Sequence, residues 1–391
     1  MIARVVDQDG NAKRREREAI MTDDRYVPGL ENVIASETNI SYLDVEAEQI
    51  VLRGYDLIEL ARSVSYVEVA GLLLNGSLPD GKGRDLLEEQ LSAASAIPDA
   101  IYDILAHVPA GTHRMDALRT AISALAGFDG ELEDHSAEAN GRKAIRLLAK
   151  VPGLVVNGHR ILSGQPVIET RGDLSFAGNF LFMLTAKVPE PLEERIFDQS
   201  LIAYSEHELP NSTFAARVIA STMSDMYGAV AGAVSSLKGY LHGGANEAVM
   251  AMLGEAATPG ELEAVMLGKL ARKERIMGFG HRVYMRKPDP RALLMKEALA
   301  RLAEAKGRQD LYEMCDAGEA VMKREKGLYP NLDYYAAPVY ALLGIPVPLF
   351  TPVFLAARTA GLCAHVSEQH AGNRLFRPRV SYTGPRGLRL S

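Results

Sequence analysis

The chain has 391 residues, of which 47% are hydrophobic and 24% charged, and its formal net charge is −7 at pH 7. A chain of this length can bury a large core and is expected to form two domains. The acidic balance argues against nucleic acid as the main partner, and the presence of just Cys315 and Cys363 excludes a disulfide framework. The sequence lacks an apolar run of membrane-spanning length and a signal-peptide core, so we expect a cytoplasmic enzyme with no membrane contact.

The N-terminal part contains a charged tail and the one convincing β segment. Residues 1–24 are charged and without periodicity, which predicts a disordered tail, and Met21 is an alternative start. The segment from Glu37 to Tyr55 has β-branched residues at both ends and predicts a small β-hairpin.

The rest of the chain predicts helix after helix, separated by short connections that contain glycine or proline. Ser65 and Glu68 form a capping-box pattern at the start of one helix, which Gly76 ends. No predicted strand alternates with the helices, so we expect an all-α fold with the small N-terminal hairpin. Further helices are expected at about 84–96, 99–108, 114–126, 137–158, 173–186, 192–206, 262–272, 291–305, 309–326 and 353–370, and one begins at Asp333.

The longest predicted helix runs from Ser212 to Lys238 and carries a ridge of small residues at a spacing of four. Such a ridge lets another helix approach closely. Glycine in a helix interior costs about 1 kcal/mol relative to alanine, so the two glycines of the ridge need a packing reason. Packing within the chain and a subunit interface both remain open. The ridge comprises Ala216, Ala220, Ser224, Gly228, Gly232 and Ser236.

The stretch IMGFGHRVYMRKPDPR contains the strongest candidate for an active-site loop. Gly278 and Gly280 allow a sharp turn that places His281 at a bend. The prolines near its end are expected to keep that end out of a helix. A histidine among glycines and cations suits an anionic substrate that exchanges a proton, whereas the alternative is a solvated basic loop. The nearby cations are Arg282, Arg286, Lys287 and Arg291.

Two further residues could take part in proton chemistry. His242 precedes two glycines and a helix, and a helix N-terminus disfavours the imidazolium, so we expect a neutral imidazole. It could donate a hydrogen bond to a carbonyl oxygen or simply cap the helix. Asp333 lies where an N-cap carboxylate would lie, and it could be a plain cap or a general base that removes a carbon-bound proton.

Other candidates are a loop histidine and several arginines. His207 lies between two glutamates, and its alternative role is that of an ordinary loop histidine. Arg291, Arg358, Arg377 and Arg379 could bind carboxylates in bidentate fashion or be surface charges. We expect no metal site, because no HExxH motif is present and the last two histidines of the chain are five residues apart.

Five stretches of the sequence resemble the citrate synthase family. GYLHGGANEAV, IMGFGHRVY with DPRA, and PNLDYYAAPVY are similar to its catalytic segments, and HELPNSTFAARVIAS and LFTPVFLAARTAGLCAHVSEQ are similar to its substrate-binding helices. The similarity runs from about Gly29 to Pro385, and in detail it resembles short bacterial citrate and 2-methylcitrate synthases. One departure is that Arg291 follows His281 at a spacing of ten residues, where the usual spacing is nine.

The resemblance implies an almost all-helical homodimer that condenses oxaloacetate with acetyl-CoA or propionyl-CoA and needs no tightly bound cofactor. The large domain would comprise residues 25–242 and 345–391, and the small domain residues 243–344. Active sites would be completed across the interface by Arg377. The products would be citrate or 2-methylcitrate, of the tricarboxylic acid cycle or of propionate metabolism.

The resemblance also implies roles for individual residues. Asp333 would remove the α-proton of the thioester, His242 would stabilise the enol, and His281 would hydrogen-bond and protonate the oxaloacetate carbonyl. Oxaloacetate would be held by His207, Arg291 and Arg358, and the coenzyme A site would be lined by Arg275, Ile276, Met277, Gly278 and Phe279. A plain citrate synthase, a non-catalytic relative of the same fold and the citrate-cleaving part of a larger lyase are the alternatives. The last would need a CoA-ligase region that this chain lacks, and intact catalytic residues argue against the second.

Overall fold

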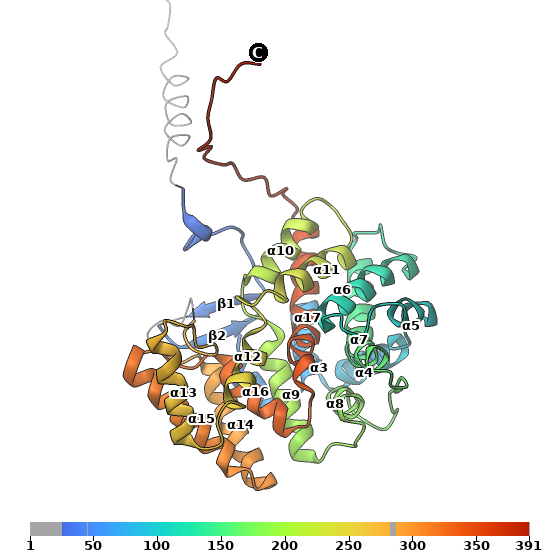
Figure 1. Ribbon diagram of the computed structural model, residues 1–391. Helices are drawn as coiled ribbons and strands as arrows, with labels where there is room; N and C mark the ends of the chain where they lie inside the picture. The colour runs from blue at the N-terminus through green and yellow to red at the C-terminus, as the bar shows by residue number, and fades with distance from the viewer. Residues whose placement is uncertain (1–25, 45, 282–286, 391) are drawn as a thin grey trace, which may run out of the picture. The chain divides into compact units, whose positions relative to one another are not determined.

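The computed structural model describes residues 26–44, 46–281 and 287–390 (Figure 1). It contains two compact units, one of residues 38–376 and one formed by the described residues before Thr38 together with those from Arg377 onward. The predicted disordered tail, residues 1–24, lies outside the described residues. The predicted division into a large and a small helical domain stays a prediction.

The predicted hairpin is confirmed, with one strand more than expected. Strands β1 (Ser41–Asp44) and β2 (Gln49–Leu52) pair antiparallel, and β3 (Tyr55–Asp56) pairs with β2 to give a three-stranded sheet. Ile50 and Leu52 are fully buried on one face, so the apolar side chains of β2 attach the sheet to the core.

Helices make up most of the described chain, which confirms the all-α prediction. Most boundaries lie within a few residues of those predicted, whereas α2 and the three short 3₁₀ turns were not predicted. The elements are η1 (Pro28–Leu30), α2 (Leu57–Ser63), α3 (Tyr66–Asn75), α4 (Gly81–Ala94), α5 (Asp99–Ala106), α6 (Arg114–Leu125), η2 (Ala126–Phe128), α7 (Ala137–Leu162), α8 (Phe176–Thr185), α9 (Pro191–Ser205), α10 (Asn211–Ala220), α11 (Met226–Leu237), α12 (Ala245–Leu253), α13 (Pro259–Ala271), α14 (Pro290–Lys306), α15 (Gln309–Lys326), α16 (Leu332–Leu342), η3 (Val347–Leu349) and α17 (Phe350–Ala371).

Caps that the sequence predicted set the ends of α3. The Ser65 side chain accepts a hydrogen bond from the Glu68 amide, and the Glu68 carboxylate accepts one from the Ser65 amide. At the other end Gly76 has φ 82°, a left-handed conformation that glycine adopts without strain. The local signals and the tertiary structure therefore agree for this helix.

The prediction of one long helix over residues 212–238 is wrong. The chain forms α10 and α11 with a break between them, because the Asp225 carboxylate accepts a hydrogen bond from the Gly228 amide at 2.8 Å and starts a new helix. A Cβ atom on Gly232 would lie 2.1 Å from Cδ1 of Ile219 in α10. At Gly232 the small residue therefore serves packing within the chain.

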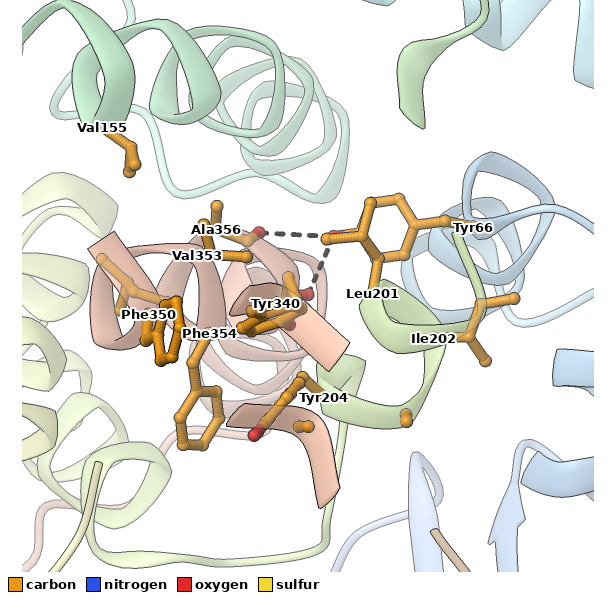
Figure 2. Close-up of a cluster of buried hydrophobic side chains, with 14 of the residues drawn as sticks. Tyr66, Val155, Leu201, Ile202, Tyr204, Tyr340, Phe350, Val353, Phe354 and Ala356 are labelled. Carbon is orange, nitrogen blue, oxygen red and sulfur yellow. Dashed lines mark hydrogen bonds between the residues drawn. The ribbon is translucent and has the colours of Figure 1, made fainter. Parts of the chain in front are cut away.

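The longest apolar helix, α17, lies in the core of the 38–376 unit. Figure 1 shows it in red among α3, α7, α9, α10 and α11, and it packs against each of them. The segment 347–371 is long and apolar enough to cross a membrane, but 89% of its most apolar window is buried by the protein, as expected for a core helix. Figure 2 shows how Tyr66 fixes this helix, because its hydroxyl donates to the main-chain oxygens of Ala356 and Ala357.

Candidate active site

Six of the seven predicted catalytic and oxaloacetate-binding residues lie together, at helix ends and in loops. The rings of two of them, His207 and His281, meet edge to face with their centroids 5.1 Å apart. Electrostatic interactions connect the two arginines with the histidines and with the carboxylate. The six are His207 after α9, His242 before α12, His281 after α13, Arg291 in the first turn of α14, Asp333 in the first turn of α16 and Arg358 in α17.

Hydrogen bonds hold the glycine loop against the segment that precedes α16. Gly278 and Gly280 have φ values of 86° and 76°, as the predicted sharp turn requires. The Gly280 amide donates to the Tyr329 oxygen at 2.9 Å, and the Asn331 amide donates to the Gly278 oxygen at the same distance. The side chain of Asn331 also donates to the Gly280 oxygen, at 3.1 Å. His281 is therefore placed next to the start of the helix that carries Asp333.

Asp333 is not the N-cap of α16, so that alternative is wrong. Asn331 is the cap, and its side-chain oxygen accepts a hydrogen bond from the Asp333 amide. The Asp333 carboxylate instead accepts a hydrogen bond from the hydroxyl of Tyr204, at 2.7 Å. Burial raises the pKa of Asp333 to about 6, against the opposing effects of Tyr204 and Arg291. A carboxylate with such a pKa is a stronger base than an ordinary aspartate and is still ionised at neutral pH.

His242 is neutral, and its hydrogen bonds define which nitrogen carries the proton. The Ser212 amide donates to Nε2 of His242 at 3.3 Å, and the Ser212 hydroxyl lies 2.8 Å from the same atom. An amide can only donate, so Nε2 is the acceptor and Nδ1 carries the proton. Burial, and then the charge of Arg358, lower the pKa of His242 to about 4. The predicted neutrality is found, but burial rather than the helix N-terminus is the main cause.

His207 and His281 are also held in the neutral form. His207 is 7% exposed, and burial lowers its pKa well below the usual value, with further lowering by Arg291, His281 and Arg358. Burial followed by the charge of Arg291 lowers the pKa of His281 to about 4, although Asp289 opposes this. Two neutral imidazoles can donate and accept hydrogen bonds without adding charge to the site.

Arg291 is held by a carboxylate that the sequence analysis did not select. Asp289 accepts hydrogen bonds from Nε and Nη2 of Arg291, at 3.0 and 2.8 Å, and from the amide of Leu332, at 3.3 Å. It also caps α14, in which Pro290 is the first residue, so the expectation that this proline keeps the chain out of a helix is wrong. Asp289 thus connects the starts of α14 and α16. An aspartate directly before a proline at a helix start was the available signal.

Arg358 is a buried guanidinium with an unmet donor. The residue is 2% exposed, its Nε donates to the Tyr204 oxygen at 2.6 Å, and its guanidinium carbon lies 4.9 Å from the centroid of the Phe354 ring. Its Nη1 is buried and has no hydrogen-bond partner among the described residues. Burial lowers the pKa of Arg358 to about 10, so the group stays charged at neutral pH. A desolvated cation with a spare donor favours an anionic ligand.

The remaining predicted residues differ in how far the structure describes them. In the predicted coenzyme A segment Arg275 is exposed, Ile276 is buried and Phe279 packs on Tyr334 with ring centroids 4.3 Å apart. Arg377 belongs to the other compact unit, where its Nη1 donates to the Pro378 oxygen.

Part of the predicted basic loop is outside the described residues, which include neither Arg282 nor Arg286. Beyond that gap, Lys287 donates to the Glu46 oxygen at 3.0 Å and pairs with the Glu48 carboxylate at 3.1 Å, both in the β1–β2 turn. No group of three or more metal-ligating side chains occurs in residues 26–44, 46–281 and 287–390.

Comparisons with known proteins point to one family. A family model described as "Citrate synthase, C-terminal domain" matches residues 29–379. The citrate/2-methylcitrate synthase of Bacillus subtilis (strain 168) is 60% identical over 361 residues, which are 92% of this chain and 97% of that protein. The citrate synthase of Heyndrickxia coagulans is 55% identical over 371 residues, which are 95% of this chain and all of that protein.

A solved structure shares the whole fold. It is the ternary complex of carboxymethyl coenzyme A and oxaloacetate with citrate synthase from the thermophilic archaeon Thermoplasma acidophilum. The two proteins are 29% identical with a TM-score of 0.89, and the match covers 94% of this chain and 98% of that one.

Proposed function

The chain belongs to the citrate synthase family, and from that premise we propose which of its residues carry the reaction and which thioesters it accepts. The protein is a transferase that condenses an acyl-CoA with oxaloacetate. We propose that it uses propionyl-CoA as well as acetyl-CoA, which gives 2-methylcitrate and citrate respectively. A plain citrate synthase is the second candidate, which the similarity to the citrate synthase of Heyndrickxia coagulans supports.

The unmet donor of Arg358 carries the proposal for oxaloacetate binding. A buried Nη1 without a partner among the described residues needs an acceptor from a ligand, and a carboxylate supplies it at full charge. Arg291 lies close enough to His207 and His281 to lower their pKa values, so it adds a second cation to the same place. Neutral His207 contributes a hydrogen bond, and the two arginines match the two carboxylates of oxaloacetate.

The removal of the thioester α-proton requires a base and a donor at the oxygen that becomes an enolate. Asp333 is proposed as the base, because its raised pKa and its position beside the arginines suit proton removal near neutral pH. His242 is proposed as the donor, because its Nδ1 carries a proton while Ser212 occupies Nε2. A neutral imidazole fixed in this way stabilises the developing negative charge without losing its own proton.

The carbon–carbon bond forms when the enol carbon attacks the ketone carbon of oxaloacetate. Negative charge then develops on the ketone oxygen, and His281, next to His207, is proposed to hydrogen-bond to this oxygen and protonate it to the hydroxyl of the product. The proton that Asp333 removes from the thioester carbon balances the proton that His281 gives up. Release of CoA from the resulting thioester consumes one water molecule. All of these steps are acid–base chemistry of the chain's own side chains, and no resident cofactor is proposed.

The experiment that tests this function follows free CoA thiol in a mixture of purified protein, oxaloacetate and either acetyl-CoA or propionyl-CoA. We expect thiol release that depends on oxaloacetate, with citrate or 2-methylcitrate as the product identified by mass. Thiol release at the same rate without oxaloacetate would identify a thioester hydrolase instead. Residues 275–279 are proposed to line the coenzyme A site, and alanine at Arg275 should raise the KM for the thioester alone.

We also propose a cytoplasmic homodimer in which Arg377 of each subunit completes the site of the other. In a mixed dimer of Arg377→Ala and Asp333→Asn subunits, one site would then hold both intact residues and the other would hold neither. Each mixed dimer should then have about half of the activity of a wild-type dimer. If Arg377 instead serves its own subunit, every site of the mixed dimer keeps one defect and no activity returns.

A further inference from the structure

Tyr204, near the end of α9, contacts two functional groups of the site at once. Its hydroxyl donates to Oδ1 of Asp333 at 2.7 Å, and its main-chain oxygen accepts from Nε of Arg358 at 2.6 Å. The residue is 1% exposed, so neither contact competes with bulk water. One residue therefore links the proposed base to the arginine proposed to bind oxaloacetate.

Aromatic packing fixes where the Tyr204 hydroxyl points. The ring centroid lies 4.4 Å from that of Phe354 and 6.3 Å from that of Tyr340. Figure 2 shows the Tyr204 ring beside Phe354, with its hydroxyl directed away from Tyr66. Burial raises the pKa of Tyr204 well above its usual value, so the hydroxyl remains protonated and can donate to a carboxylate.

A carboxylate has two oxygens that can take a proton, and Tyr204 occupies one of them. Resting on the proposed role of Asp333 as the base, we propose that Tyr204 is a positioning residue that holds Oδ1 of Asp333, leaves Oδ2 to take the thioester proton and sets the pH at which the base becomes available. A hydrogen bond to the ionised carboxylate stabilises that form, so Tyr204 opposes the effect of burial on Asp333. The main chain of Tyr204 holds Arg358 whatever its side chain is.

Other groups also act on the Asp333 carboxylate, and none of them depends on the Tyr204 hydroxyl. Arg291 and Arg358 favour the ionised form, and Asp289 disfavours it. In α12 the charged residue is Glu247, which accepts a hydrogen bond from Thr351. In α16, the helix that carries Asp333, Tyr340 contributes a neutral phenol. Removal of the Tyr204 hydroxyl alone should therefore change the ionisation of Asp333 in a known direction.

The test is the pH dependence of kcat/KM in the full-length protein with Tyr204→Phe. The acid limb should move to higher pH by about one unit, because the ionised base loses a charge-assisted hydrogen bond. kcat should fall about tenfold through lost orientation, while the KM for oxaloacetate stays within about twofold because the contact to Arg358 comes from the main chain. An acid limb that stays in place in an active variant would overturn the proposal.

A second substitution makes the opposite prediction and keeps the ring volume. Site-specific 3-fluorotyrosine at position 204 is a more acidic phenol and a stronger donor, so the acid limb should move to lower pH. The control is Tyr66→Phe, which removes another buried hydrogen-bonded hydroxyl, one that contacts α17 away from Asp333. It should lose stability and keep the wild-type acid limb, and a shift equal to that of Tyr204→Phe would overturn the proposal. A wild-type protein without condensation activity would instead contradict the proposed function.

Discussion

Two buried basic residues of α17, Arg358 and His365, lie seven residues apart and therefore on the same face of the helix, but their surroundings differ. His365 accepts a hydrogen bond at Nδ1 from Nη1 of Arg217 at 3.0 Å and donates from Nε2 to Oε1 of Glu206 at 3.0 Å. Arg217 is itself paired with Glu368 at 2.6 Å. Arg358 donates from Nε to the main-chain oxygen of Tyr204, and its Nη1 has no hydrogen-bond partner among the described residues.

The comparison teaches that, at these two positions of α17, pairing rather than burial separates the residue with a structural role from the residue proposed to bind a ligand. Both residues are at most 2% exposed, so burial alone would place them in one class. Gly361, between them, lets Glu206 approach, because a Cβ atom there would lie 2.3 Å from Oε2 of Glu206. Glu206 thereby accepts the hydrogen bond from Nε2 of His365 and partly offsets the charge of Arg358. The donor that remains unmet is left for a ligand.

The largest expected effect comes from the base. Asp333→Asn should lower kcat by at least about 100-fold while oxaloacetate still binds, because the variant keeps the shape but cannot take a proton. The folded protein favours the protonated form of Asp333, because its pKa is raised in the folded state. The free energy of unfolding that this residue contributes is therefore fully present below its unfolded pKa and is lost as the pH rises through about 6. The variant should therefore be more stable than wild type at pH 8, by about 1–3 kcal/mol. Turnover measurements check the loss of activity, and denaturant unfolding at pH 8 checks the gain in stability. Near-normal turnover would show that Asp333 is not the base.

The next effect tests the comparison of His365 with Arg358 directly, with one substitution in the surroundings of His365 and one at Arg358 itself. Arg217→Met should cost about 3 kcal/mol of stability, because Glu368 and His365 lose a buried partner. Arg358→Met should cost less stability, because its Nη1 has no described partner to lose, but it should raise the KM for oxaloacetate about 100-fold. Urea unfolding and steady-state kinetics on both variants provide the measurements. If the two variants exchange these phenotypes, pairing does not separate the structural role from the functional role at these two positions of α17.

A smaller effect should appear in the wild-type pH profile. The base must be ionised, so kcat/KM should fall about tenfold per pH unit below the Asp333 pKa of about 6. His242 and His281 have pKa values of about 4 and stay neutral through this range, so they should add no second limb near pH 6.5. A limb centred near 4 would mean that the carboxylate is not the group that limits the reaction.

Much of this site could be predicted from the sequence because its residues lie at turns and helix starts, which short sequence patterns mark. Gly278 and Gly280 predicted the turn before His281, and Asp333 and His242 were found at helix starts. The break before α11 was missed although its signal is local. Asp225 is a favoured N-cap residue and accepts a hydrogen bond from the Gly228 amide, but the ridge of small residues continues across it at helical spacing.

The partners of the site residues were also out of reach of the sequence. Tyr204 precedes His207 by three residues, but only the packing of α9 against α16 shows that its hydroxyl meets Asp333. Asp289 was visible as part of DPRA, yet its bond to the Leu332 amide joins positions 43 residues apart. Periodicity predicts which face of a helix is buried, but not which polar atoms meet there.

The smallest expected effect concerns the choice between two thioesters. It extends the comparison of paired and unpaired polar atoms to the uncharged acyl group of the substrate. Propionyl-CoA and acetyl-CoA differ by one methylene, which an apolar site can distinguish by only about 1–3 kcal/mol. A site that admits the propionyl group leaves no polar atom unpaired when acetyl binds, unlike the unmet donor of Arg358, so loss of the methyl group costs little. We therefore expect kcat/KM values for the two thioesters of comparable size at saturating oxaloacetate.

Steady-state kinetics with both thioesters on one preparation tests this expectation. The KM for oxaloacetate is the internal control, since both reactions use the same Arg291 and Arg358. A propionyl-CoA value more than about 100-fold below that for acetyl-CoA, near the limit that one methylene can impose, would leave a plain citrate synthase.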